Sequence, residues 1–143
     1  KMNKLIFSAF MLLFSLASYA QQITPEIKMM FKNDDISNFD KIINKENINK
    51  CYPIEEFSYS LLALSIKMNK PNVFKKLINE KANLDLICDD KTPLMYTVKY
   101  GNLDFAKLLL ENGANKKAIS NKGNTALDYA KKYDQKELIK ILD

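Results

Sequence analysis

Histidine, arginine and tryptophan are all missing from this chain, and its 22 basic residues are all lysine. Without histidine, the chain lacks the most common metal ligand and the most common general base. Without arginine, it lacks the side chain that binds phosphate and guanine through two parallel hydrogen bonds. These absences disfavour an enzyme, a metal protein and a nucleic-acid-binding protein, and no motif indicates a cofactor.

Glycine and proline are scarce, with three and four residues, which disfavours a turn-rich all-β fold. The chain has 143 residues, of which 47% are hydrophobic and 27% charged, as in an ordinary globular domain. The formal net charge is +5, and it falls to +3 when Lys1 and Lys4 at the start of the chain are left out, which is too small to indicate a nucleic acid as partner.

The start of the chain has the pattern of a secretory signal peptide. Lys1 and Lys4 give a positive start, residues 5–17 form an apolar run, and a small-x-small pattern ends at Ala20. We expect residues 1–20 to be cleaved, and the mature protein to be periplasmic or secreted with no membrane span. A buried first helix or an uncleaved anchor is the alternative.

The rest of the chain repeats with a period close to 33 residues. The segment from Thr92 reads TPLMYTVKYGNLDFAKLLLENGAN, and the segment from Thr125 reads TALDYAKKYDQKELIKILD. Another copy begins at Ser60 and reads SLLALSIKMNKPNVFKKLINEKAN. A weaker copy of the second half of a unit covers residues 33–49. The pattern predicts a stack of similar units.

Each unit is predicted to contain two antiparallel helices. The hydroxyl of Thr92 can cap the first helix, and Pro93 suits its first turn. Gly101 allows a turn, and apolar residues three and four apart predict a second helix over residues 103–111. Gly113 suits the left-handed position that follows a helix. The side chains expected in the core include Leu94, Val98, Leu109, Leu127, Met29, Met30 and Phe31.

These residues resemble the ankyrin repeat, through the T-P-L opening, the glycine in mid-repeat and the L-L-L-x-x-G-A-N close of the unit from Thr92. The resemblance implies an all-α fold over residues 21–143, an ankyrin-repeat solenoid of antiparallel helix pairs. Three recognisable repeats follow a degenerate N-terminal one. The predicted repeats are 24–59 as a degenerate cap, 60–91, 92–124, and 125–143 as a C-terminal cap. An unrelated array of helical hairpins is the alternative.

The histidine of the ankyrin repeat is replaced by Ala63, Met95 and Asp128. We therefore expect the hydrogen bonds that it usually makes between repeats to be lost, with a loss of rigidity but no change of fold.

The resemblance also implies where a partner would bind, namely at the loops between repeats and at the exposed ends of the first helices. A lysine followed by a large side chain recurs there, and we call this set the lysine–aromatic row. The row consists of Lys67-Met68, Lys99-Tyr100 and Lys132-Tyr133. The loops add Tyr59, Lys91 and Lys122 as candidates. The alternative is that these are ordinary solvated helix ends, where lysine is favourable.

The linker over residues 50–59 is longer than its counterparts and is expected to be a loop. Acidic pairs at Asp34-Asp35, Glu55-Glu56 and Asp89-Asp90 are interpreted as solvated loop residues.

Cys51 and Cys88 lie in consecutive linkers at nearly equivalent positions. Such positions in neighbouring repeats are expected to be slightly too far apart for a bond, which needs Cα atoms within about 7 Å. Free thiols are the default expectation, and a disulfide closed by the longer first linker is the alternative.

The function implied by the resemblance is that of an exported bacterial protein–protein interaction module, a monomer that binds an unidentified protein. An immunity or inhibitor protein that neutralises a specific toxin or enzyme is the alternative. An enzyme or a metal protein is a distant one.

Overall fold

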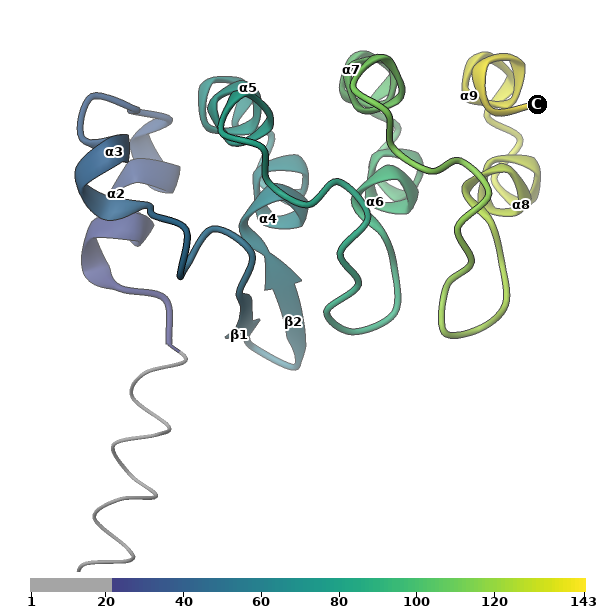
Figure 1. Ribbon diagram of the computed structural model, residues 1–143. Coiled ribbons are helices and arrows are strands. Elements are labelled where there is room, and N and C mark those ends of the chain that lie inside the picture. Colours follow the sequence, from purple (N-terminus) through teal and green to yellow (C-terminus); the bar gives the residue numbers. More distant parts are fainter. Residues whose placement is uncertain (1–21) are drawn as a thin grey trace, which may run out of the picture.

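The computed structural model describes residues 22–143 as a row of helix pairs (Figure 1). The predicted signal peptide, residues 1–20, lies outside the described residues. The helices are α2 (Pro25–Asn33), α3 (Phe39–Ile42), α4 (Leu61–Lys67), α5 (Pro71–Asn79), α6 (Pro93–Lys99), α7 (Leu103–Glu111), α8 (Ala126–Lys132) and α9 (Lys136–Leu142). Two strands, β1 (Cys51–Ile54) and β2 (Phe57–Ser60), form an antiparallel hairpin.

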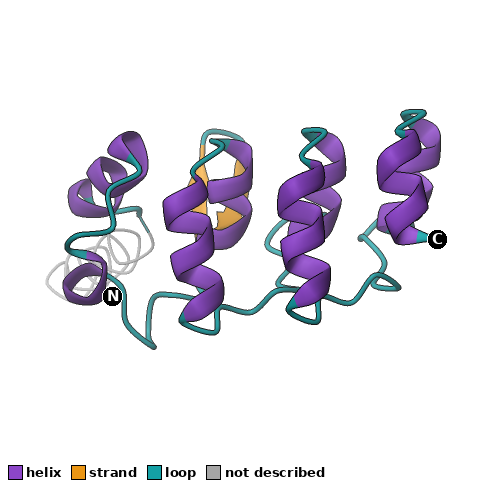
Figure 2. Ribbon diagram, turned by 90° about the horizontal axis from the view of Figure 1, so that it is seen from above, coloured by secondary structure: helices purple, strands orange, loops and turns teal. Residues whose placement is uncertain are grey.

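The helix pairs stand side by side in chain order (Figure 2). In Figure 1, α5, α7 and α9 form an outer layer, and α4, α6 and α8 form an inner layer. The segments that connect successive pairs extend from the inner layer on the side away from the outer layer. The predicted helical solenoid is therefore confirmed, with one β-hairpin added to it.

The first helix of every pair begins at a hydroxyl residue. The side-chain oxygen of Thr92 accepts a hydrogen bond from the backbone N–H of Met95 at 3.3 Å, as predicted. The same role belongs to Thr24, Ser60 and Thr125. Each cap satisfies a backbone donor that has no partner within the helix, so the caps place every repeat in register with the sequence period.

The turns between helices use left-handed backbone even where glycine is absent. Gly101 has a φ of 65°, and Asn69 takes the equivalent position with a φ of 52°. Gly113 has a φ of 94°, which confirms its predicted left-handed position, and Lys81 has a φ of 61° in the preceding repeat. Replacing glycine by lysine there keeps the turn but costs free energy, because the Cβ atom crowds the backbone.

Two of the predicted core residues are misplaced. Leu94, Val98 and Leu109 are buried as expected. Leu127 is only half-buried, because α8 buries the face formed by Ala126, Tyr129 and Ala130. At the N-terminal end Met30 and Phe31 are buried with Ile27, at helical spacing, whereas Met29 lies off that face and is 54% exposed.

Hydrogen bonds between repeats are present despite the missing histidine. The carboxylate of Asp34 accepts the backbone N–H groups of Asn72 and Val73 at 3.1 and 2.9 Å, and so caps α5 from the preceding repeat. The side-chain amide of Gln135 donates to the carbonyl of Val98 at 2.8 Å. The bonds of the missing histidine itself cannot form, but these other polar side chains also link successive repeats. Asp34 is also wrongly interpreted as a solvated loop residue.

Candidate partner-binding face

The three segments that connect the repeats are called fingers here. The hairpin finger is residues 51–60, the second finger is 83–92 and the third finger is 115–125. In the hairpin finger, where a loop was expected, Cys51 pairs with Ser60 and Ile54 pairs with Phe57. The positive φ of Glu55 closes the turn, and Phe57 stands beside it with half of its surface exposed.

A disulfide joins the first two fingers. Cys51 and Cys88, which the sequence left either free or bonded, are bonded in the structure with their Cα atoms 5.4 Å apart. The default expectation of free thiols is therefore wrong, and the alternative, a disulfide closed by the longer first linker, is confirmed. That linker folds into a hairpin. Hairpin formation brings Cys51 next to the second finger.

The second and third fingers are joined by hydrogen bonds. The backbone N–H of Asn121 donates to the carbonyl of Asp90 at 3.2 Å. The side-chain amide of Asn121 donates to the carbonyl of Asp89. All three fingers are thus held to their neighbours, so they form a preorganised surface.

The lysine–aromatic row lies at the same place in three successive repeats. Met68, Tyr100 and Tyr133 are the C-cap residues that directly follow α4, α6 and α8. They are 41%, 39% and 47% exposed, respectively. Each large side chain is thus available to solvent, and the row stays a candidate binding surface.

A chain of tyrosine rings connects the row with the hairpin finger. The ring of Tyr59 lies 5.5 Å from that of Tyr96, centroid to centroid, and Tyr96 stacks nearly parallel on Tyr100 at 6.3 Å. Burial raises the pKa of Tyr96 well above its usual range, and nearby negative charges act in the same direction. Tyr59, which was predicted to be a binding residue, is only 3% exposed, so its ring packs beneath this surface and is not available to a partner. Tyr96, 5% exposed, lies beneath the surface as well and was not predicted to contribute to it. Its only signal was a tyrosine four residues before Tyr100, on the same face of α6.

Lysine ammonium groups lie against these rings. The Nζ atom of Lys67 donates to the hydroxyl oxygen of Tyr59 at 3.2 Å and lies 4.5 Å from the centre of its ring. The Nζ atom of Lys99 is 5.6 Å from the ring centre of Tyr100. Partial burial acts to lower the pKa of Lys67, but the hydrogen bond to Tyr59 and nearby negative charges outweigh it and raise the pKa. Cation–π attraction therefore helps to hold both lysines in place.

The second finger carries one ion pair. The Nζ atom of Lys91 lies 2.6 Å from a carboxylate oxygen of Asp90, and both side chains are largely buried. Burial acts to raise the pKa of Asp90, but the hydrogen bond and charge of Lys91 lower it overall. Lys91 also lies 5.0 Å from the ring centre of Tyr129, so it joins the second finger to α8.

A hollow of about 310 Å³ opens where the hairpin finger and the second finger meet α6. We call it the inter-finger hollow. Its lining residues are Phe57, Tyr59, Asp89, Asp90, Lys91, Tyr96, Lys99, Asn121 and Lys122. It brings four of the predicted candidates together, namely Tyr59, Lys91, Lys99 and Lys122.

The remaining members of the row lie outside that hollow. Lys67 and Tyr100 line a neighbouring hollow of about 590 Å³ at the turns that follow α4 and α6. Met68, Lys132 and Tyr133 line neither of these two hollows. Of the row, Lys67, Lys99 and Tyr100 therefore line these two hollows, and Lys99 shares its hollow with residues of the fingers.

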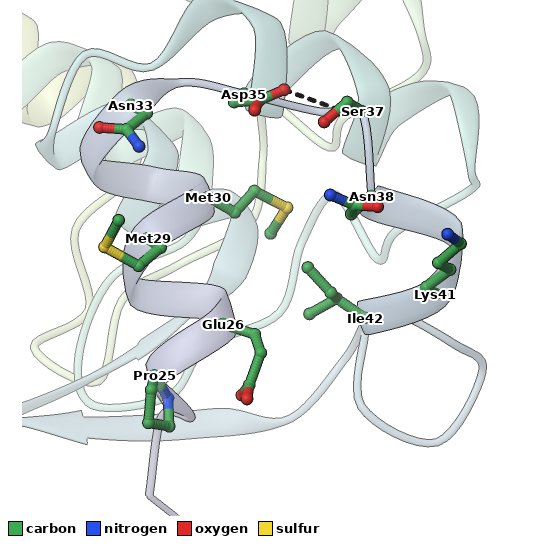
Figure 3. A pocket seen from close by; sticks show the side chains of 10 residues that line it. All are labelled: Pro25, Glu26, Met29, Met30, Asn33, Asp35, Ser37, Asn38, Lys41 and Ile42. Atoms are coloured by element: carbon green, nitrogen blue, oxygen red, sulfur yellow. Dashed lines mark hydrogen bonds between the residues drawn. The ribbon is translucent and has the colours of Figure 1, made fainter.

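A separate hollow of about 680 Å³ lies between α2 and α3, in the repeat that precedes the one carrying Lys67 and Met68. Met30 and Ile42 point into the space between the two helices, and Asp35 accepts a hydrogen bond from the backbone of Ser37 at 2.9 Å (Figure 3). No sequence-predicted site residue lies there.

Within residues 22–143, no group of three or more acidic or cysteine side chains could hold a metal ion. None of the helices over these residues is long and apolar enough to cross a membrane.

Comparison with known proteins gives consistent matches. The family model described as ankyrin repeats (3 copies) matches residues 29–120 and 61–142. An ankyrin repeat protein of Acanthamoeba polyphaga mimivirus is 28% identical over 92 residues, which are 64% of this chain and 27% of the viral protein. The chain thus spans about a quarter of that relative's length.

The ankyrin repeat domain of Bcl-3, a member of the IkappaB protein family, has a similar fold. It superimposes with a TM-score of 0.57 at 23% identity, over 63% of this chain and 42% of that one. Ankyrin repeats generally mediate protein–protein interaction and are typically not enzymes. Because the family model covers most of the chain, this protein belongs to the ankyrin-repeat family.

Proposed function

We propose that this protein is an exported interaction module that binds a partner protein through one face of the solenoid. This tyrosine–lysine face consists of the lysine–aromatic row with Lys91 and Lys122, and it is supported from beneath by Tyr59 and Tyr96, which are only 3% and 5% exposed. The observation that carries the proposal is the unbroken contact from Tyr59 through Tyr96 to Tyr100. It joins a finger to a helix end, the two regions through which ankyrin proteins usually bind.

The face combines exposed aromatic area with little freedom to lose on binding. Tyrosine is enriched among the residues that dominate interface energies. Tyr100 is 39% exposed yet stacked on Tyr96, and the fingers beside it are held by a disulfide and hydrogen bonds. A partner would therefore pay little entropy to order this surface.

Export is supported by the pattern of residues 1–20 and by the bond between Cys51 and Cys88, since disulfides persist mainly in oxidising compartments. A bacterial periplasm or the extracellular space would meet this requirement. Expression in a Gram-negative host, followed by fractionation and intact-mass measurement, tests it. We expect a product that has lost about twenty residues outside the cytoplasm. Full-length soluble protein in the cytoplasm would contradict export.

The binding role is tested by crosslinking and affinity measurement. A photo-crosslinking amino acid at Lys99 should capture the partner from the cells that export the protein. Tyr100→Ala should then weaken binding by about 2 kcal/mol or more, with little change in melting temperature.

Met29→Ala is the matched control, because Met29 is an exposed apolar side chain on α2 and belongs to no part of the face. We expect this variant to bind like the parent. Equal binding by both variants would move the interface elsewhere. An immunity or inhibitor role is a special case that identification of the captured protein would decide.

A further inference from the structure

We propose that the partner presents an acidic segment to the tyrosine–lysine face, with carboxylates that contact Lys67 and Lys99. The segment would also carry an apolar side chain next to its acidic ones. This inference rests on the proposed function and adds the chemistry of the partner to it.

The two lysines lack a negative partner of their own. Over residues 22–143, ion pairs involve Lys76, Lys91 and Lys140. Neither Lys67 nor Lys99 has a carboxylate oxygen within 4 Å in that part of the chain. Both ammonium groups instead lie against tyrosine rings that form or support the face. They are therefore positioned cations whose strongest hydrogen bonds, those to carboxylates, are still unmade.

The two lysines line neighbouring hollows. Lys67 and Tyr100 line one hollow, and Lys99 and Lys122 line the inter-finger hollow. Since Lys99 and Tyr100 are adjacent in the chain, an extended segment could run from Lys67 past Lys99 toward Lys122. It would meet three lysines along this path.

The acidic residues of the same region restrict the path. Asp90 is neutralised by Lys91, whereas Glu55 at the hairpin turn and Asp89 on the second finger are exposed. They would repel an acidic segment from the finger tips and direct it toward the helix ends. The charge of Glu55 also attracts the Lys67 ammonium group without contacting it. A carboxylate of the partner could therefore still bind Lys67 directly.

The apolar requirement follows from exposed side chains at the edges of the path. Phe57, which lines the inter-finger hollow, is 50% exposed, and Met68, the neighbour of Lys67 in the chain, is 41% exposed. An aromatic or aliphatic residue of the partner would cover this surface. A basic segment would instead face several unpaired ammonium groups.

Selection from a random peptide library displayed on phage tests the inference without the native partner. Peptides are selected on the oxidised wild-type protein, and their affinity is measured for Lys67→Gln/Lys99→Gln. The matched control is Lys75→Gln/Lys107→Gln, because these lysines are exposed at equivalent positions of the outer helices α5 and α7.

We expect the selected peptides to carry two or more acidic residues next to an aromatic or aliphatic one. Their affinity should be at least tenfold lower for the Lys67→Gln/Lys99→Gln variant and unchanged for the Lys75→Gln/Lys107→Gln control. It should also weaken as salt is added. The inference would be overturned if the selected peptides were neutral or basic, if no peptide were enriched, or if both variants lost affinity equally. It would also be overturned if the face bound a single-stranded DNA oligonucleotide and no acidic peptide. The proposed function would survive such a result if Tyr100→Ala still weakened binding of the captured partner.

Discussion

Removal of the disulfide should have the largest effect on stability of any change to the fingers. Cys51 and Cys88 close a loop with a sequence separation of 37 residues. The bond ties the degenerate first repeat to the repeat from Ser60, where no glycine eases the turns. Cys51→Ser/Cys88→Ser removes the link while changing two side chains that are not part of the core.

The magnitude follows from the chain entropy of the unfolded state. A crosslink that closes a loop of this length lowers the unfolded-state entropy enough to stabilise the fold by about 4 kcal/mol at 25 °C. The melting temperature should fall by roughly 10–20 °C for a domain of this size. We expect protection from hydrogen exchange to fall most in α2 and α3, because they contact few other elements.

Urea unfolding of the oxidised parent, the reduced parent and the double variant measures this effect. The reduced parent is the control, because it lacks the bond but keeps both cysteines, so it should match the variant. Free energies that agree within about 1 kcal/mol across all three would refute the reasoning. Thiol titration of denatured, unreduced protein gives an independent check, since two free thiols per chain would exclude the bond.

Other predictions concern the helices and their caps. Leu109→Ala should cost about 2–5 kcal/mol in unfolding free energy, and Leu108→Ala, at a half-buried position, clearly less; equal costs would mean that the register of α7 is wrong. Lys81→Gly should raise the unfolding free energy by roughly 0.5–1 kcal/mol, because relief of left-handed strain exceeds the entropy cost of glycine; an unchanged or lower urea midpoint would contradict this. Hydrogen bonds from the Thr125 backbone and hydroxyl lower the pKa of Asp128, so its contribution is full above about pH 4 and is lost as the pH falls through the lowered pKa. Asp128→Asn should therefore lose less stability than the parent between about pH 5 and pH 2, and parallel pH curves would count against this cap.

The repeat architecture could be predicted from the sequence because its signals are local. A capping hydroxyl such as that of Thr92 acts on an amide three residues away, and Gly113 acts on its own backbone. The apolar spacing of α7 depends only on the geometry of one helix. The bounds predicted for that helix, residues 103–111, are those observed. The positions of the lysine–aromatic row follow from the same period.

Contacts between repeats were decided only by the tertiary structure, because they join residues more than thirty positions apart. Asp34 reads as a loop residue until the stacking of α5 places two free N–H groups beside it. Tyr96 is a core residue, as its helical spacing suggests, but its contact with the ring of Tyr59 arises only because the hairpin finger folds against α6. The pairing of Cys51 with Cys88 requires their Cα atoms to lie within about 7 Å. That distance depends on how the hairpin packs against the second finger, which residues near either cysteine do not decide alone.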